Sequence, residues 1–155
     1  MMKLRILGSS NAIPRVDREN TYFLLEGENT SVLIDTGSNA IAKLNGLGIS
    51  CDKITDIIIT HFHPDHVGGL PLLLMDWWLM GRTNPLTIRG LPHTIQRIQK
   101  MMDLFDWQKW PYFFQVNFHE LHDMPGPILE NSEIKIIGNE VQHLIPTLGL
   151  RFESI

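Results

Sequence analysis

The sequence predicts an α/β or α+β fold in which helices cover a sheet. Short runs of β-type composition alternate along the chain with segments of helical periodicity. Of the 155 residues, 43% are hydrophobic and 19% are charged, which is the composition of a chain that buries a core. No internal repeat, low-complexity tract or Ser/Gly-rich linker divides the sequence. Residues 1–155 are therefore expected to form a single domain.

The predicted strands are apolar or alternating runs that are bounded by turn residues. They cover residues 3–7, 21–26, 31–35, 56–60, 86–89, 115–120, 133–141 and 148–153. Residues 27–30 separate the second run from the third and are predicted to form a hairpin turn.

Helices are predicted over residues 39–47 and 67–80, and from Pro92 onward, where apolar residues recur on one helical face. Segment 67–80 is the most apolar of the chain, but it carries Asp76 and is shorter than the roughly 20 apolar residues that span a membrane. No membrane association is expected. Apolar side chains cover nearly all sides of this helix, so burial in the core and burial against a partner subunit both stay open.

The charge balance and the cysteine content exclude several classes of protein. Thirteen Lys and Arg against 17 Asp and Glu give a net charge of −4, so no global basic field is available to hold a nucleic acid. Any polyanion has to be bound locally. The single cysteine, Cys51, cannot form an internal disulfide and is expected to be a small buried hydrophobic side chain. Residues 1–8 are too short for a signal peptide, so a reducing, cytoplasmic location is expected.

Three histidines and an aspartate lie within the segment His61-Phe62-His63-Pro64-Asp65-His66, directly after a β-branched run. Because side chains alternate in an extended segment, His61 and His63 project to the same side and can share one ion. Pro64 ends the strand, which places Asp65 and His66 in a tight turn that leads into the next helix. The spacing therefore predicts two adjacent metal positions.

A mixed set of imidazole and carboxylate ligands favours zinc, as one or two ions, with manganese or iron as contenders. The alternatives are a surface histidine cluster that binds metal adventitiously and a loop held by internal hydrogen bonds. The other histidines of the central region are expected to have no metal role. His119 and His122 are separated by three positions, whereas the zinc-binding helix motif requires four, and His93 lies at a helix start.

On these residues, the sequence resembles the metallo-β-lactamase superfamily, whose H-x-H-x-D-H signature lies on such a strand-to-helix turn. Residues 32–37, Val-Leu-Ile-Asp-Thr-Gly, resemble the superfamily strand that ends in a structural aspartate, here Asp35. His143 resembles the histidine of the third motif. Within the superfamily, residues 7–14, 69–71 and 143–151 resemble the ribonuclease Z branch.

The resemblance implies a metallo-β-lactamase-like αβ/βα sandwich, of which this chain supplies about the first half. It further implies that His61, His63 and His143 hold the first metal, while Asp65 and His66 contribute to the second. Asp65 is implied as a catalytic residue that orients or deprotonates the bridging water. Asp35 is implied to fix the loop at its strand end without being a ligand. No substrate-binding residue is identified.

Superfamily members continue into a second half that supplies a bridging aspartate and a last histidine, and the chain stops at Ile155 before either. The chain is therefore expected to be a truncated form whose second metal site is weak. Half of a sandwich is also expected to expose the inner apolar face of its sheet. This predicts association with another copy or with a complementary second half.

The resemblance and the metal chemistry together predict a metal-dependent hydrolase. Divalent ions attract anionic groups and lower the pKa of bound water from about 15.7 to about 7, so hydroxide can attack at neutral pH. A phosphodiesterase of the ribonuclease Z type, acting on an anionic small molecule or on RNA, is the leading hypothesis. The alternatives are a hydrolase of thioesters, lactams or lactones, and a non-catalytic metal-binding half that works beside a complementary subunit.

Overall fold

The computed structural model describes residues 2–37 and 39–155 of the chain. Its strands are β1 (Lys3–Gly8), β2 (Tyr22–Glu26), β3 (Ser31–Ile34), β4 (Asp56–Ile58), β5 (Leu86–Gly90), β6 (Val116–Glu120), β7 (Gly126–Glu130), β8 (Ile134–Val141) and β9 (Thr147–Ser154). Its α-helices are α1 (Ala40–Gly46), α2 (Pro64–Val67), α3 (Leu70–Leu79) and α4 (Pro92–Asp103). Two 3₁₀ helices, η1 (Cys51–Lys53) and η2 (Trp107–Lys109), complete the elements of these described residues.

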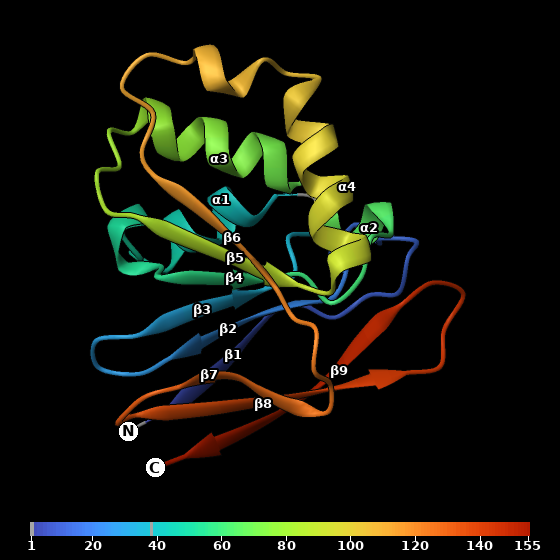
Figure 1. The fold of residues 1–155 in the computed structure, drawn as a ribbon. Coiled ribbons are helices and arrows are strands. Elements are labelled where there is room, and N and C mark those ends of the chain that lie inside the picture. Colours follow the sequence, from blue (N-terminus) through green and yellow to red (C-terminus); the bar gives the residue numbers. More distant parts are fainter. Residues whose placement is uncertain (1, 38) are drawn as a thin grey trace.

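The elements form three layers (Figure 1). The central layer is a six-stranded sheet with the order β1-β2-β3-β4-β5-β6. Strands β1, β2 and β3 pair antiparallel, and the pairs from β3 to β6 are parallel. Figure 1 shows α1, α3 and α4 on one face of this sheet and β7, β8 and β9 on the other. The predicted α/β class is therefore confirmed.

The second sheet packs on the face of the six-stranded sheet that the sequence analysis expected to be exposed. Strands β7, β8 and β9 form an antiparallel three-stranded sheet, and a buried apolar cluster lies between it and the first sheet. Leu25, Val32 and Ile34 of the first sheet share this cluster with Ile134 and Ile136 of β8. The expectation of an exposed inner face is thus wrong for these central strands, because residues 126–154 fold back over them.

Most predicted strands and the hairpin at residues 27–30 are confirmed, with Gly27 N donating to Thr30 O at 2.7 Å. Strand β7 was not predicted. Its segment begins Gly126-Pro127 after Pro125, a composition typical of turns. Because β7 is an edge strand of the three-stranded sheet, a proline can be accommodated in it.

The helix predicted over residues 67–80 is confirmed for residues 70–79, but its predicted start is wrong. Helix α2 ends at Val67 and α3 begins at Leu70, with Gly68 and Gly69 between them. Gly69 N donates to Thr36 O at 3.3 Å, and a Cβ atom on Gly69 would lie 2.2 Å from Gly37 O. The helix is therefore interrupted at Gly69, where the loop after β3 lies so close to the backbone that no side chain can be accommodated.

Helix α3 has one buried face and one exposed face. Leu70, Leu73, Leu74 and Trp77 are buried in the core cluster between helices and sheet. Leu72, Leu79 and Met80 at the helix and its end are exposed. Core burial therefore accounts for only part of its apolar surface. Among the residues that the structure describes, no helix has the length and apolar character needed to cross a membrane.

Replacing Gly69 with alanine is expected to destabilise the fold by about 1 to 3 kcal/mol, because backbone atoms have to move to admit the methyl group. The midpoint of urea unfolding measures this change. Gly46→Ala is the matched control, since Gly46 ends α1 and a Cβ atom there would meet nothing within 4 Å. Equal midpoints for the two variants would contradict the close approach.

The topology gathers several loops at one edge of the six-stranded sheet. Strands β1, β3, β4 and β5 run in the same direction, so their carboxyl ends share this edge (Figure 1). The β8–β9 hairpin reaches the same edge, where Leu148 N donates to Thr60 O at 3.0 Å. The predicted metal-binding residues all belong to these loops or to the helix that begins there.

Candidate metal centre

The histidine-rich segment leaves the sheet as an irregular extended chain. Strand β4 ends at Ile58, two residues earlier than predicted, and Ile59 N still donates to Arg89 O of β5 at 2.9 Å. His63 has extended backbone angles (φ −95°, ψ 149°) and caps α2, whose first residue is Pro64. Proline suits this first helical position, since its missing N–H would have no partner in the helix. Asp65 and His66 therefore lie in the first turn of α2.

The structure brings His61, His63 and His143 together. His63 Nδ1 lies 3.1 Å from His61 Nε2 and 3.2 Å from His143 Nε2. One ligand atom from each residue can be chosen so that all lie within 4.8 Å of one another. His61 is buried, His63 is partly buried and His143 is exposed, so the cluster opens to solvent on one side.

These separations fit a shared cation. Tetrahedral zinc with Zn–N distances of about 2.0 to 2.1 Å places neighbouring nitrogens about 3.3 Å apart. The two short separations at His63 Nδ1 are close to that value. A single ring nitrogen cannot donate one proton to both neighbours, whereas three lone pairs can converge on one ion. The donor set therefore fits a divalent metal such as zinc.

Asp35 is a buried carboxylate that binds residues beside the histidine cluster. It is 3% exposed and follows β3 with φ of 60°, a left-handed conformation that aspartate tolerates. Thr60 donates to Asp35 Oδ1 through its backbone N–H at 2.7 Å and to Asp35 Oδ2 through its hydroxyl at 2.9 Å. His66 Nδ1 lies 2.7 Å from Asp35 Oδ2. One carboxylate thus links the strand end to the first turn of α2.

This network fixes which imidazole nitrogens are free. His66 Nδ1–H donates to Asp35, which leaves His66 Nε2 with its lone pair. The Thr60 hydroxyl donates to Asp35 and lies 3.0 Å from His61 Nδ1, so it accepts from that nitrogen and leaves His61 Nε2 free. Sequence reasoning missed Thr60. Its position between the strand and His61 was the available signal.

Burial and neighbouring histidines lower the pKa of His61 to about 4, so its ring is neutral at pH 7. Burial acts most strongly on His66 and lowers its pKa, but the hydrogen bond to Asp35 and the negative charges of Asp35 and Asp65 together outweigh burial, so the pKa is raised. Burial raises the pKa of Asp35, against the hydrogen bonds from His66 and Thr60. His61 therefore offers its lone pair at neutral pH, whereas His66 holds a proton more firmly.

Asp65 and His66 form a second, separate pair. His66 Nε2 lies 3.4 Å from Asp65 Oδ2, and each side chain is 21% exposed. The His61 and His66 ring centroids are 4.1 Å apart, so this pair adjoins the histidine cluster. The structure thus provides two groups of possible metal ligands. The first is the three imidazoles of His61, His63 and His143, and the second is the imidazole of His66 with the carboxylate of Asp65.

Asp35→Asn is expected to weaken metal binding by about 10- to 100-fold, the usual cost of losing an outer partner of a ligand. The asparagine amide cannot accept hydrogen bonds from Thr60 and His66 as the carboxylate does. Competition with a chromophoric chelator measures the affinity.

Asp106→Asn is the matched control for this prediction. Asp106 also has a left-handed backbone (φ 52°), but it lies at the exposed start of η2. Equal affinities of the two variants for zinc would contradict the role of Asp35 in orienting the ligands.

The other histidines and the cysteine lie outside this cluster. His119 is exposed on β6, and His122 is exposed beside Glu120, with 3.2 Å between His122 Nε2 and the carboxylate. His93 lies in the first turn of α4, and its Nδ1 is buried without a hydrogen-bond partner among the described residues. Cys51 is buried in the core, as expected.

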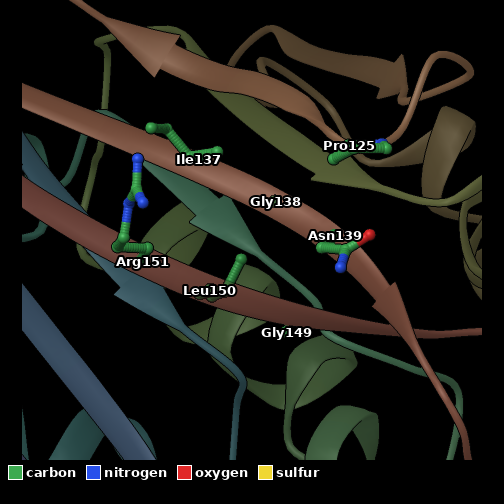
Figure 2. A pocket seen from close by; sticks show the side chains of 7 residues that line it. All are labelled: Pro125, Ile137, Gly138, Asn139, Gly149, Leu150 and Arg151. Carbon is green, nitrogen blue, oxygen red and sulfur yellow. The ribbon is translucent and has the colours of Figure 1, made fainter.

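A shallow hollow on the second sheet is unrelated to these residues (Figure 2). It includes Gly138 and Gly149, which lie on the neighbouring strands β8 and β9. The lining residues are Pro125, Ile137, Gly138, Asn139, Gly149, Leu150 and Arg151. Arg151, its one charged residue, pairs with Glu153 at 2.8 Å. The hollow therefore offers no cluster of reactive groups.

The layered sheets and the histidines at their edge define a protein of the metallo-β-lactamase fold. Human tRNase Z, short form, matches with a TM-score of 0.81 at 24% identity, covering 99% of this chain and 65% of that one. The metallo-β-lactamase fold protein YhfI from Bacillus subtilis matches with a TM-score of 0.76 at 21% identity, covering 98% and 57%.

The chain belongs to the family described as Anti-Pycsar protein Apyc1, whose sequence model matches residues 2–103. Ribonuclease Z from Methanothermobacter thermautotrophicus is 30% identical over 156 residues, which cover 99% of this chain and 48% of the relative. Ribonuclease Z from Pyrococcus abyssi is 32% identical over 158 residues, with the same coverage. The chain is thus similar to ribonuclease Z in sequence and has the metallo-β-lactamase fold, and it spans about half the length of the curated relatives it matches.

Proposed function

We propose that this chain carries the metal-binding part of a metal-dependent phosphodiesterase that acts on nucleic-acid phosphodiesters. The convergence of His61, His63 and His143 is the observation that carries the proposal. The similarity to proteins named ribonuclease Z and to a diphosphatase of the PhnP family supports a phosphate substrate. The sequence alternatives, which include thioester and lactam hydrolysis, become outcomes of the test.

In this proposal, His61, His63 and His143 hold the first ion, and Asp65 and His66 contribute to a second. Zinc is the favoured ion because the set is rich in imidazole nitrogen, with manganese or iron next. A bound divalent ion supplies positive charge for the phosphodiester and lowers the pKa of a water molecule to about 7. Asp35 engages His66 at Nδ1 directly and His61 at Nδ1 through the Thr60 hydroxyl, so that Nε2 is the atom of each ring left for a metal.

Asp65 is the proposed catalytic residue among the side chains of this chain. Its carboxylate is partly exposed in the first turn of α2 and adjoins the histidine cluster through His66. A carboxylate there can accept a proton from water at Oδ2 and pass it to solvent. The protein needs no side-chain nucleophile for this chemistry.

The second position has only two donors in the described part of the chain, Asp65 and His66. We therefore propose that it binds an ion weakly until another copy or a complementary second half completes it. The exposed apolar residues Leu72 and Leu79 of α3 and Met80 directly after it support such an association. A single domain over residues 1–155 and a reducing, cytoplasmic location belong to the same proposal, the latter supported by the single buried cysteine.

Metal titration followed by a substrate panel tests the function. Titration with zinc is expected to fill one tight site per chain, and His143→Ala is expected to abolish it. The metal-loaded protein is then offered bis-p-nitrophenyl phosphate beside thioester and lactam probes, and only the phosphodiester is expected to be hydrolysed. Absence of a tight site, or cleavage of the thioester or lactam in preference to the phosphodiester, would overturn the proposal.

A further inference from the structure

A polar pocket lies in the loop that follows β1. It has a volume of about 220 Å³ and is lined by Ser9, Ser10, Asn11, Arg15 and Arg18. No carboxylate is among these lining residues, although the whole chain has a net charge of −4. The pocket is therefore a local positive site on an acidic protein, which is where a bound anion has to be held.

The two arginines face each other. Arg15 and Arg18 form an isolated antiparallel bridge, in which Arg15 N donates to Arg18 O at 2.8 Å and Arg18 N donates to Arg15 O at 3.2 Å. Residues that exchange both hydrogen bonds lie directly opposite each other, and like charges in such a pair repel. Asp17 Oδ2 lies 3.4 Å from Arg18 Nε at an exposed position, so it offsets at most one of the two charges. An anion between the guanidinium groups relieves the remaining repulsion.

Among the neighbouring polar groups, Asn11 offers a donor to a ligand. Asn11 Oδ1 accepts from Ile13 N at 3.0 Å, so the part of the Asn11 side chain left for a ligand is its NH₂ group. The Ser10 hydroxyl donates to Ile13 O at 2.9 Å, so this bond holds the loop and its proton is not available to a ligand. Guanidinium and amide N–H groups are suited to the oxygens of a phosphate.

The loop is fixed before any ligand binds. Asn20 is 5% exposed, and its Nδ2 donates to Asn11 O at 3.0 Å and to Ala12 O at 3.2 Å. Ser10 N donates to Glu19 O at 2.7 Å, and the Thr21 hydroxyl donates to Ser10 O at 2.7 Å. Little conformational entropy remains to be lost in the backbone of this loop when a ligand is held.

The pocket lies at the same sheet edge as the histidine cluster. Its loop follows the carboxyl end of β1, whereas Asp35 and His61 follow those of β3 and β4 (Figure 1). The Tyr22 ring connects the two regions, since Cβ atoms on Gly8 and Gly37 would each lie within 2.9 Å of it. The two sites therefore share one edge of the six-stranded sheet.

We propose that Arg15 and Arg18 bind a phosphate of the nucleic-acid chain other than the phosphodiester at the histidine cluster. This inference rests on the proposed function for the identity of the ligand. Binding in the absence of metal and of cleavage tests it separately from hydrolysis.

The experiment measures fluorescence anisotropy of labelled hexauridylate with the 155-residue chain in EDTA at low salt. The double variant R15Q/R18Q is expected to raise the Kd about tenfold or more and to make the salt dependence of log K shallower by about 0.7 per lost phosphate contact. The control R97Q/R151Q removes the same charge from two other exposed arginines and is expected to change the Kd less than twofold. R15K/R18K keeps the charge and is expected to restore binding in part.

Equal weakening by R15Q/R18Q and R97Q/R151Q would mean that only overall charge matters, which overturns the site. Unchanged binding by R15Q/R18Q overturns it as well. Competition with uridine monophosphate tests whether the pocket prefers a nucleic-acid chain to a free nucleotide. If the affinity of uridine monophosphate falls as much as that of hexauridylate in R15Q/R18Q, the assignment to a nucleic-acid chain is wrong. Failure of the hydrolysis panel with a retained R15Q/R18Q effect removes the proposed activity but leaves the anion site.

Discussion

His63→Ala is expected to lower the affinity of the tight zinc site by about 100-fold or more. This loss exceeds that expected for a residue that only hydrogen-bonds to a ligand. His63 Nδ1 is the nitrogen that lies 3.1 Å from His61 and 3.2 Å from His143, so its removal leaves those two residues without the donor between them. Zinc stoichiometry and affinity by isothermal titration calorimetry measure the effect.

His119→Ala is the control for this variant, because it removes an exposed histidine of β6 and leaves the cluster untouched. Its zinc affinity is expected to stay within about twofold of the unmodified chain. If His63→Ala retains tight zinc while His119→Ala loses it, the ion binds elsewhere and the cluster is not the metal centre.

Arg82→Met is expected to destabilise the fold by about 3 kcal/mol or more, because it leaves several buried carbonyl groups without a donor. Arg82 is 3% exposed and donates through Nη1 to Cys51 O and through Nη2 to Ile54 O at 2.7 Å and Pro85 O at 3.0 Å. Its guanidinium also lies 5.1 Å from the centroids of the Trp77 and Phe114 rings. The midpoint and slope of urea unfolding measure the change.

Arg97→Met is the matched control for Arg82. Arg97 is exposed on α4 and donates only to His93 O within its own helix, so its replacement is expected to cost less than about 0.5 kcal/mol. Arg82 lies near the amino ends of β4 and β5, at the sheet edge opposite the histidines. The folded Arg82→Met variant is therefore expected to bind zinc normally, and a selective loss of zinc affinity would contradict this separation.

Local sequence patterns predicted most strands, the hairpin and the arrangement of residues 61–66. These features depend on neighbours in the chain: a β-branched run, a proline that ends it and alternating side chains. The site role of His143 came from the resemblance, since it lies 80 residues from His63 and no local pattern connects them. The structure places them 3.2 Å apart through the β8–β9 hairpin, while their role as ligands stays a prediction.

The features that the sequence analysis missed depend on contacts through space. The break between α2 and α3 results from the approach of Gly69 to Gly37 O, and neither residue signals the other in the sequence. Strand β7 was missed because its prolines are typical of turns. An edge strand can nevertheless accommodate proline. Thr60 orients His61 because it is itself held by Asp35. Asp35 follows β3 whereas Thr60 follows β4, so no local pattern links the two residues.

A crystal structure of the chain with zinc, using anomalous scattering at the zinc edge, tests the central proposal most directly. The predicted result is one strong peak within about 2.0 to 2.1 Å of an imidazole nitrogen from each of His61, His63 and His143. A peak bound by only one of these rings, or a zinc ion located away from all three, would contradict the metal centre and the hydrolase function built on it.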